Sequence, residues 1–142
     1  MTTIRKLTKR TEFLFVRQGV RAGRPTVTIE ARRRSDDGPI GIGLTASKKV
    51  GGAVQRNRAR RRLREAARQL LPEFGLAGVD YVLVARQHTP AAPWPALLDD
   101  IRNALIRLRA DLEPGAAPAR RSRRARTSSQ SEKTGARSAK GD

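Results

Sequence analysis

The feature that most constrains this 142-residue chain is a basic stretch at residues 48–68, KKVGGAVQRNRARRRLREAAR. It holds nine lysines and arginines against one acid, Glu65, which is a net charge of +8 in 21 residues. Burying that charge without partners would be very costly, because the charged groups would lose their hydration. The apolar residues nevertheless recur at helical spacing. The stretch is therefore predicted to be an ordered helix that faces a polyanion, and nucleic acid is the first candidate.

The composition of the whole chain supports a nucleic-acid partner. Its formal net charge is +18 and its pI is about 11.8, the electrostatic footprint of a nucleic-acid-binding protein. The absence of cysteine excludes disulfides, thiolate metal sites and cysteine nucleophiles. No apolar run has the length of a secretory signal or a membrane span, so we expect a cytoplasmic protein with no membrane partner.

The charge and the apolar residues divide the chain into two parts. Residues 1–112 carry a net charge of +13 and enough apolar residues for one modest core. Residues 113–142 carry +5 and contain no Leu, Ile, Val or aromatic residue, so they cannot bury enough apolar surface to offset the entropy of ordering. We predict a binding domain at 1–112 and a basic, disordered tail at 113–142.

Hydrophobic periodicity predicts six elements in the order α-β-β-α-β-α. Apolar residues at spacings of three and four mark the helices, and alternating or continuous apolar runs mark the strands. The expected elements lie at residues 8–18, 26–33, 40–46, 53–71, 80–86 and 93–112. Thr8 or Thr11 can cap the first helix. This order is typical of an α+β fold with a small, mostly antiparallel sheet and helices packed on it, in which the second strand, the basic helix and the third strand form a possible β-α-β crossover.

Two glycines, Gly41 and Gly43, share one face of the strand expected at 40–46. Glycines on one strand face indicate that another backbone or a helix approaches closely there. We therefore expect an element to pack tightly against that face.

The basic helix divides into two faces at about 100° per residue. A docking face of small and apolar residues is expected to pack on the sheet: Ala59, Leu63, Ala66, Ala67 and Leu70. A contact row lies opposite: Asn57, Arg61, Arg64 and Arg68. A run of arginines can be no more than a solvated face, but the scarcity of acids for ion pairing favours contact with nucleic acid. Arg56 falls on the docking side, so either the regular helix starts after Asn57 or the Arg56 side chain turns to the helix N-terminus.

The chain carries no recognisable active site of its own. A protein nuclease needs clustered carboxylates or histidines to hold Mg²⁺ or to move protons. The acidic pairs at 36–37 and 99–100 fit a turn and a helix start, and the single histidine, His88, falls in a loop. We predict no catalytic residue and no metal ligand in this chain.

The stretch SKKVGGAVQRNRARRRLREAAR resembles the signature of the bacterial ribonuclease P protein subunit. That signature has a Ser-Lys-Lys-Val-Gly lead, then Arg-Asn-Arg, then a basic helix ending Leu-Arg-Glu-Ala. A basic first helix with Phe13, the GLTASKK strand exit, the DYVLVAR strand and the amphipathic last helix extend the resemblance over residues 4–112. Three residues depart from the usual pattern of the family: Arg17, Gly52 and Ala59.

The resemblance implies an accessory protein subunit whose partners are a catalytic RNA and precursor tRNA, with no DNA expected. The RNA removes the 5′ leader, using Mg²⁺ that is held mainly by RNA. The resemblance also implies a left-handed β-α-β crossover, where general rules favour a right-handed one.

Charge and resemblance together assign candidate residues to the two RNA contacts. The residues expected to hold the catalytic RNA are Lys48, Lys49, Arg56, Asn57, Arg58, Arg60, Arg61, Arg62, Arg64 and Arg68. The residues expected at a leader-binding cleft between the first helix and an exposed polar sheet face are Phe13, Phe15, Arg17, Thr26, Thr28 and Arg32. Core packing is the alternative for both phenylalanines.

Two other functions can be set against this one. A basic ribosomal or RNA-chaperone protein with no role in cleavage could carry the same charge and fold. A helix-turn-helix DNA regulator needs two helices joined by a short turn, whereas strands are expected on both sides of the basic helix here.

Overall fold

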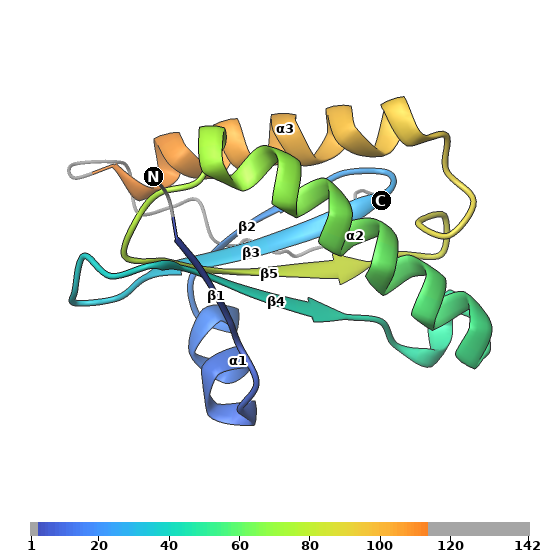
Figure 1. Cartoon of the computed structure of the whole chain (residues 1–142), viewed down its shortest axis with the longest axis horizontal. Coiled ribbons are helices and arrows are strands. Elements are labelled where there is room, and N and C mark those ends of the chain that lie inside the picture. Colours follow the sequence, from blue (N-terminus) through green and yellow to red (C-terminus); the bar gives the residue numbers. More distant parts are fainter. Residues whose placement is uncertain (1–2, 114–142) are drawn as a thin grey trace, which may run out of the picture.

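The computed structural model describes residues 3–113, in which three α-helices pack on a five-stranded sheet (Figure 1). The elements are β1 (Ile4–Lys6), α1 (Arg10–Arg17), β2 (Val20–Gly23), β3 (Val27–Arg33), β4 (Ile40–Thr45), the 3₁₀ turn η1 (Lys48–Val50), α2 (Ala53–Phe74), β5 (Val79–Ala85) and α3 (Trp94–Leu112). The predicted α+β class is confirmed. The tail predicted at 113–142 lies outside the described residues, apart from its first residue.

The sheet is mixed, with the strand order β1-β4-β5-β3-β2. The antiparallel pairs, β3 with β5 and β2 with β3, join seven and four residue pairs. The parallel pairs, β4 with β5 and β1 with β4, join five and three. The predicted β-α-β crossover is confirmed, since β4 and β5 flank α2 in the chain and are parallel neighbours. Its left-handed sense stays a prediction.

The sequence does not predict the two edge strands, β1 and β2. Their segments, IRK and VRAG, are three and four residues long and contain two and one charged residues. So short a segment contains at most two periods of the strand alternation, which is too little to separate it from a loop. Their pairing depends on the neighbouring strands and not on their own pattern.

The helices cover both faces of the sheet, with α2 and α3 on one face and α1 on the other (Figure 1). The docking face predicted for α2 is buried in the main core, as expected, and Leu71 joins it. Burying one such leucine contributes about 1.5–3 kcal/mol. The helix ends three residues later than predicted. Pro72 lies within its last turn and does not end it.

The two glycines of β4 let the N-terminal segment pack closely, as predicted. A Cβ atom added at Gly43 would lie 2.6 Å from the Phe13 ring, nearer than side chains approach one another. One added at Gly41 would collide with the Asp80 carboxylate and touch Leu7. Bare backbone at these positions therefore lets α1 and the segment before it lie directly on the sheet.

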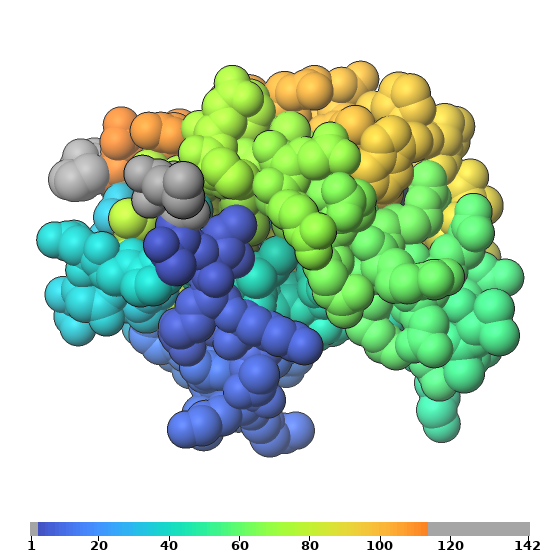
Figure 2. Space-filling model, viewed as in Figure 1, coloured from blue at the N-terminus to red at the C-terminus, as the bar shows by residue number. Residues whose placement is uncertain are grey.

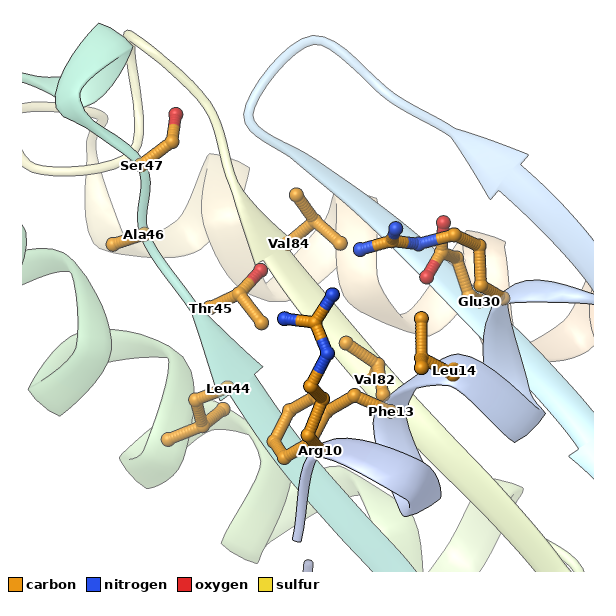
Figure 3. Close-up of a pocket in the computed structure, with 11 residues that line it drawn as sticks. Arg10, Phe13, Leu14, Glu30, Leu44, Thr45, Ala46, Ser47, Val82 and Val84 are labelled. Carbon is orange, nitrogen blue, oxygen red and sulfur yellow. The ribbon is translucent and has the colours of Figure 1, made fainter. Parts of the chain in front are cut away.

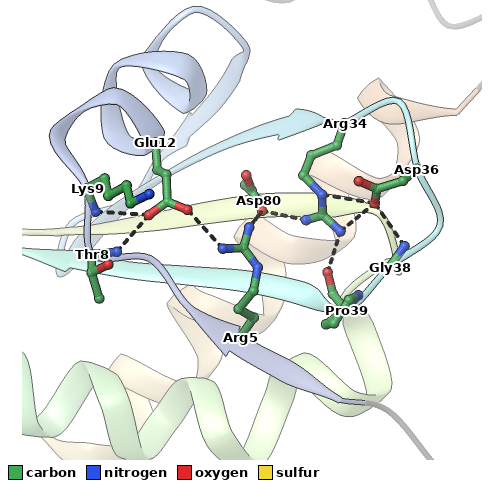
Figure 4. Close-up of polar contacts among 9 residues, drawn as sticks. All are labelled: Arg5, Thr8, Lys9, Glu12, Arg34, Asp36, Gly38, Pro39 and Asp80. Carbon is green, nitrogen blue, oxygen red and sulfur yellow. Dashed lines mark hydrogen bonds and ion pairs between the residues drawn. The ribbon is translucent and has the colours of Figure 1, made fainter.

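The start of α1 is capped by Glu12 and not by the predicted Thr8 or Thr11. The N-cap residue is Lys9, and the Glu12 carboxylate accepts hydrogen bonds from the backbone N–H groups of Thr8 and Lys9 at 2.8 and 2.9 Å (Figure 4). Arg5 of β1 donates to the same carboxylate at 2.9 Å. A carboxylate three residues into a helix satisfies amide groups that the helix itself leaves unpaired.

A second carboxylate, that of Asp80, holds the N-terminal strand β1 to the centre of the sheet. Asp80 is 3 % exposed and accepts a hydrogen bond from Arg34 at 2.5 Å. Arg5 lies 3.7 Å from the same oxygen, and Arg34 also reaches Asp36 in the β3–β4 turn at 2.9 Å (Figure 4). A buried carboxylate needs such partners. The ion pairs link β1, β5 and the β3–β4 turn.

The cap at Glu12 gives stability a predictable pH dependence. The backbone donor of Lys9, then Arg5, then Thr8 lower the pKa of Glu12 from 4.5 to about 2. Because the folded-state pKa is the lower one, this contribution is complete above about pH 4.5 and is lost as the pH falls towards 2. We expect Glu12→Gln to destabilise the fold at pH 7 by about 0.5–1 kcal/mol.

Urea unfolding followed by circular dichroism, repeated between pH 7 and pH 2, measures this effect. The difference between Glu12→Gln and the natural chain should shrink across that range. Glu73→Gln, an exposed change at the end of α2, is the matched control and should cost little at any pH. A Glu12→Gln difference that stays constant with pH would contradict the role given to the cap.

Candidate RNA interface

The contact row predicted on α2 is exposed. Its members are Asn57, Arg61, Arg64 and Arg68. Arg68 lies 3.7 Å from Glu65, an exposed ion pair of a kind that contributes about 0–1 kcal/mol. The Asn57 side-chain oxygen accepts a hydrogen bond from Arg60 at 2.8 Å. The row therefore keeps its positive charge available to a ligand in solvent.

Arg56 takes the second of its two predicted alternatives. The helix begins at Ala53, so it includes Arg56, whose backbone N–H donates to the Gly52 carbonyl at 2.9 Å. The guanidinium turns back and donates to the Gly51 carbonyl at 3.1 Å. Arg56 thus leaves the docking side and closes the turn between η1 and α2. Lys48 and Lys49 lie exposed in η1, just before that turn.

Two other predicted RNA-binding residues, Arg58 and Arg62, are engaged with the loop between β5 and α3. Arg58 donates to the Pro90 carbonyl at 2.7 Å. Arg62 lies over the Trp94 ring, 5.7 Å from its centroid. The Arg62 guanidinium also donates to three loop carbonyls, those of Thr89, Pro90 and Ala92. Burial, and then the neighbouring Arg58, lower the pKa of Arg62. These two arginines join α2 to the start of α3.

A cleft of about 550 Å³ lies between α1 and the sheet, on the face opposite α2 (Figure 3). Val82 and Val84 of β5 lie at its floor, with Leu44 and Thr45 of β4 beside them. The remaining residues that line it are Arg10, Phe13, Leu14, Arg17, Glu30, Ala46 and Ser47. An apolar floor between cations suits a ligand with a flat apolar part and a negative charge.

Of the six residues predicted for the cleft, Phe13 and Arg17 line it. Phe15 points to another side of α1, where the Arg32 guanidinium lies 4.3 Å from its ring centroid and donates to its carbonyl at 3.3 Å. Phe15 packs beside a small core cluster of Leu7, Val16 and Val82. Phe13 packs beside the same cluster, but it also lines the cleft, whereas Phe15 does not.

The prediction that Thr26 and Thr28 lie on an exposed polar face of the sheet is wrong, because both residues are buried. Thr26 precedes β3, so strand alternation does not apply to it. Its N–H and hydroxyl donate to Asp100 of α3 at 3.0 and 2.7 Å. Thr28 pairs with Gly23 of the unpredicted strand β2. Neither residue lines the cleft.

Sequence reasoning missed Arg10, Leu14 and Glu30 at the cleft. Arg10 and Leu14 could have been predicted from the helical spacing, because they lie three or four residues from Phe13 and Arg17 on one face of α1. Glu30 also carried a signal, because strand alternation places it on the same face of β3 as the predicted residues Thr28 and Arg32.

A second hollow, of about 390 Å³, lies between the N-terminal segment, β4 and α2. Phe13 and Leu44 line both hollows, and Arg60 and Arg64 of α2 stand on the far side of the second one. Figure 2 shows the N-terminal segment and α2 on one face of the molecule, with part of β4 between them. The second hollow therefore borders both the cleft, through Phe13 and Leu44, and the contact row, through Arg64.

Comparison with known proteins decides the family. The model of the family described as Ribonuclease P matches residues 1–109. The chain belongs to the ribonuclease P protein family. It is 50 % identical to the ribonuclease P protein component of Caulobacter vibrioides (strain NA1000 / CB15N) over 111 residues, covering 78 % of this chain and 74 % of that one. It is 50 % identical to that of Ruegeria pomeroyi over 107 residues, covering 73 % and 86 %.

Solved structures of this family share the fold. The ribonuclease P protein from Thermotoga maritima superposes with a TM-score of 0.62 at 22 % identity, covering 72 % of this chain and 96 % of that one. The Staphylococcus aureus protein gives a TM-score of 0.57 at 23 % identity, covering 70 % and 91 %. At this identity the likeness supports the architecture and not particular site residues.

The described part of the chain contains neither a candidate metal site nor a candidate membrane-spanning helix. Within residues 3–113, no group of three or more His, Cys, Asp or Glu side chains could hold a metal ion. No helix in the same range is long and apolar enough to span a bilayer.

The different surroundings of Arg61 and Arg62 predict different effects on stability. Arg62→Ala removes the donor from three loop carbonyls, so we expect a loss of about 1.5–3 kcal/mol. Arg61→Ala removes an exposed side chain, so we expect a change within about 0.5 kcal/mol. Urea unfolding of the two variants measures the contrast, and equal losses would contradict the role given to Arg62.

Proposed function

We propose that this chain is the protein subunit of ribonuclease P, which binds the catalytic RNA and the 5′ leader of precursor tRNA and assists endonucleolytic removal of the leader. The family match over residues 1–109 carries this proposal. It gives no support to the alternative of a ribosomal or RNA-chaperone protein. The exposed arginine row and the cleft give the chain two surfaces suited to RNA.

The contact row of α2 would hold the folded catalytic RNA. Arg61, Arg64 and Arg68 project from one helix face, and η1 adds Lys48 and Lys49 at the helix start. Guanidinium groups bind phosphates in a planar, bidentate manner. Each neutralised phosphate releases condensed counterions, so affinity should fall steeply with salt. These contacts would position the protein without reading sequence.

The cleft would receive the single-stranded leader. Arg10 and Arg17 offer charges for phosphates, and Phe13 offers an aromatic surface for a base. Stacking of one base on an aromatic side chain contributes about 1–3 kcal/mol. The second hollow then leads across β4 to Arg60 and Arg64, so one RNA assembly could contact both surfaces.

Cleavage itself is assigned to the RNA, with Mg²⁺ held mainly by the RNA. The observation behind this assignment is that several carboxylates of the chain already have structural partners. Glu12 caps α1, Asp80 binds Arg34, and Asp100 accepts two hydrogen bonds from Thr26. We place the complex in the cytoplasm, with precursor tRNA as its substrate.

Reconstitution at low Mg²⁺ tests the proposed function. The purified protein is mixed with a bacterial ribonuclease P RNA and a precursor tRNA that carries a labelled 5′ end. We expect leader removal to be faster than with RNA alone, because the protein adds substrate contacts and offsets phosphate repulsion. No acceleration would overturn the proposal. Cleavage by the protein without RNA would overturn the assignment of catalysis to the RNA.

A triple variant, Arg61, Arg64 and Arg68→Ala, tests the contact row. If each arginine meets a phosphate, the slope of log affinity against log salt should become shallower by about 2–3. The matched control is Arg102, Arg107 and Arg109→Ala on α3, which removes the same charge from another helix. Filter binding to the catalytic RNA across a salt series measures both slopes. Equal slopes for the two variants would show that only net charge matters.

A further inference from the structure

One acid, Glu30, is found among the described residues that line the cleft. It lies on the central part of β3, opposite Arg21 of β2 and Val82 of β5. Arg10, which Figure 3 shows beside Phe13, lines the same cleft, and so does Arg17. In a protein with a formal charge of +18, a carboxylate inside a surface suited to RNA repels phosphates unless it binds another part of the ligand.

The Glu30 carboxylate lacks hydrogen-bond donors within the described part of the chain. Glu30 is 8 % exposed, and its one ion pair is with Arg21, whose guanidinium lies 4.0 Å away. That separation is beyond a hydrogen bond, which spans about 2.7–3.2 Å. A carboxylate accepts hydrogen bonds and cannot donate them. The Glu30 oxygens stay open to solvent, because among the described residues the fully buried side-chain polar atom without a partner belongs to Arg24. The cleft therefore presents an acceptor that is prepared for donors on a ligand.

An RNA strand can supply such donors through its bases. The phosphates would lie towards Arg10 and Arg17, because Glu30 repels them, so that a base would face the carboxylate. An unpaired base offers its Watson–Crick edge for hydrogen bonds while it stacks on an aromatic ring. Phe13 provides that ring in the same cleft.

The four bases differ in what they offer to a carboxylate. Guanine presents its N1–H and N2–H groups side by side, which matches the two carboxylate oxygens. Adenine and cytosine present one amino group beside a ring nitrogen that is itself an acceptor, and uracil presents one N–H between two carbonyls. A paired contact to a charged acceptor is stronger and more selective than a single one.

We propose that Glu30 binds the Watson–Crick edge of one leader base in the cleft and makes the protein favour guanine there. This inference rests on the proposed function, because it takes the leader as the occupant of the cleft. Glu30 is then a specificity-determining residue, and Phe13, Arg10 and Arg17 supply contacts that any base can use.

The test uses the reconstituted complex and a set of precursor tRNAs that differ at one leader position at a time. Each position carries G, A, C or U in turn, and kcat/KM is measured by competition. The same substrates with the RNA alone, at higher Mg²⁺, give the base dependence that does not involve the protein. We expect the protein to add a preference for guanine of about 10-fold at one position, within the range of a good bidentate contact.

The variant Glu30→Gln has nearly the same shape but lacks the charge and one acceptor. We expect it to remove most of the added guanine preference while cleavage of the other three substrates changes less. Glu73→Gln is the control, since it removes an exposed negative charge from the end of α2 and should leave the preference unchanged. A Glu30→Gln effect equal on all four bases would overturn the inference in favour of simple repulsion.

A second measurement needs no variant and therefore does not depend on how Glu30→Gln folds. Inosine replaces guanine at the preferred position, which removes the 2-amino group and one of the two hydrogen bonds. We expect the preference to fall by about 3- to 10-fold, which is the range of one ordinary hydrogen bond. An unchanged rate with inosine would overturn the bidentate contact.

These outcomes are distinct from failure of the proposed function. If the protein accelerates cleavage but adds no base preference at any leader position, the role of Glu30 is wrong and the function stands. If the protein does not accelerate cleavage at all, the function itself is wrong.

Discussion

The whole arrangement depends on one constraint, which is that α2 must lie against the sheet while most of its charge stays in water. Small and apolar residues form its buried face, so the helix docks along a narrow strip. Arg56, Arg58 and Arg62, at the margin of that strip, donate to backbone carbonyls. A carbonyl satisfies a guanidinium without cancelling its charge. The helix is therefore anchored firmly and remains positive from Arg56 to Arg68.

The carboxylates have a different task, which is to hold the smaller elements in place. Glu12 closes the start of α1, and Asp80 holds Arg5 and Arg34 beneath it. Asp100 fixes the residue before β3 to the start of α3. Since α1 forms one wall of the cleft, these acids determine the shape of that surface, while the arginines of α2 determine its attraction for a polyanion. Glu30 is the acid that fits neither task.

The parts of this structure that follow from the sequence are those encoded by repeated patterns. The docking face of α2 and the long strands recur over many residues, so their periodicity was sufficient. The roles of Arg58 and Arg62 were not predictable, because their acceptors are backbone carbonyls of a loop about thirty residues away, which no side-chain pattern marks. Thr26 was misplaced because β3 begins one residue later than its alternation suggests. The cleft was predicted through Phe13, and the alternation of β3 placed Glu30 on the same face as Thr28 and Arg32, but the sequence does not show which residues of that face tertiary packing leaves open.

The lack of a side chain at Gly43 limits which mutations this protein tolerates at that position. Phe13 packs where a side chain at position 43 would have to be, so any replacement forces the ring to move. That position faces α1, whereas the arginine row belongs to the helix on the opposite face of the sheet. A single codon change at Gly43 would therefore damage the cleft and leave the row intact. The effect would reach the row only through the second hollow, which Phe13 shares with Arg60 and Arg64.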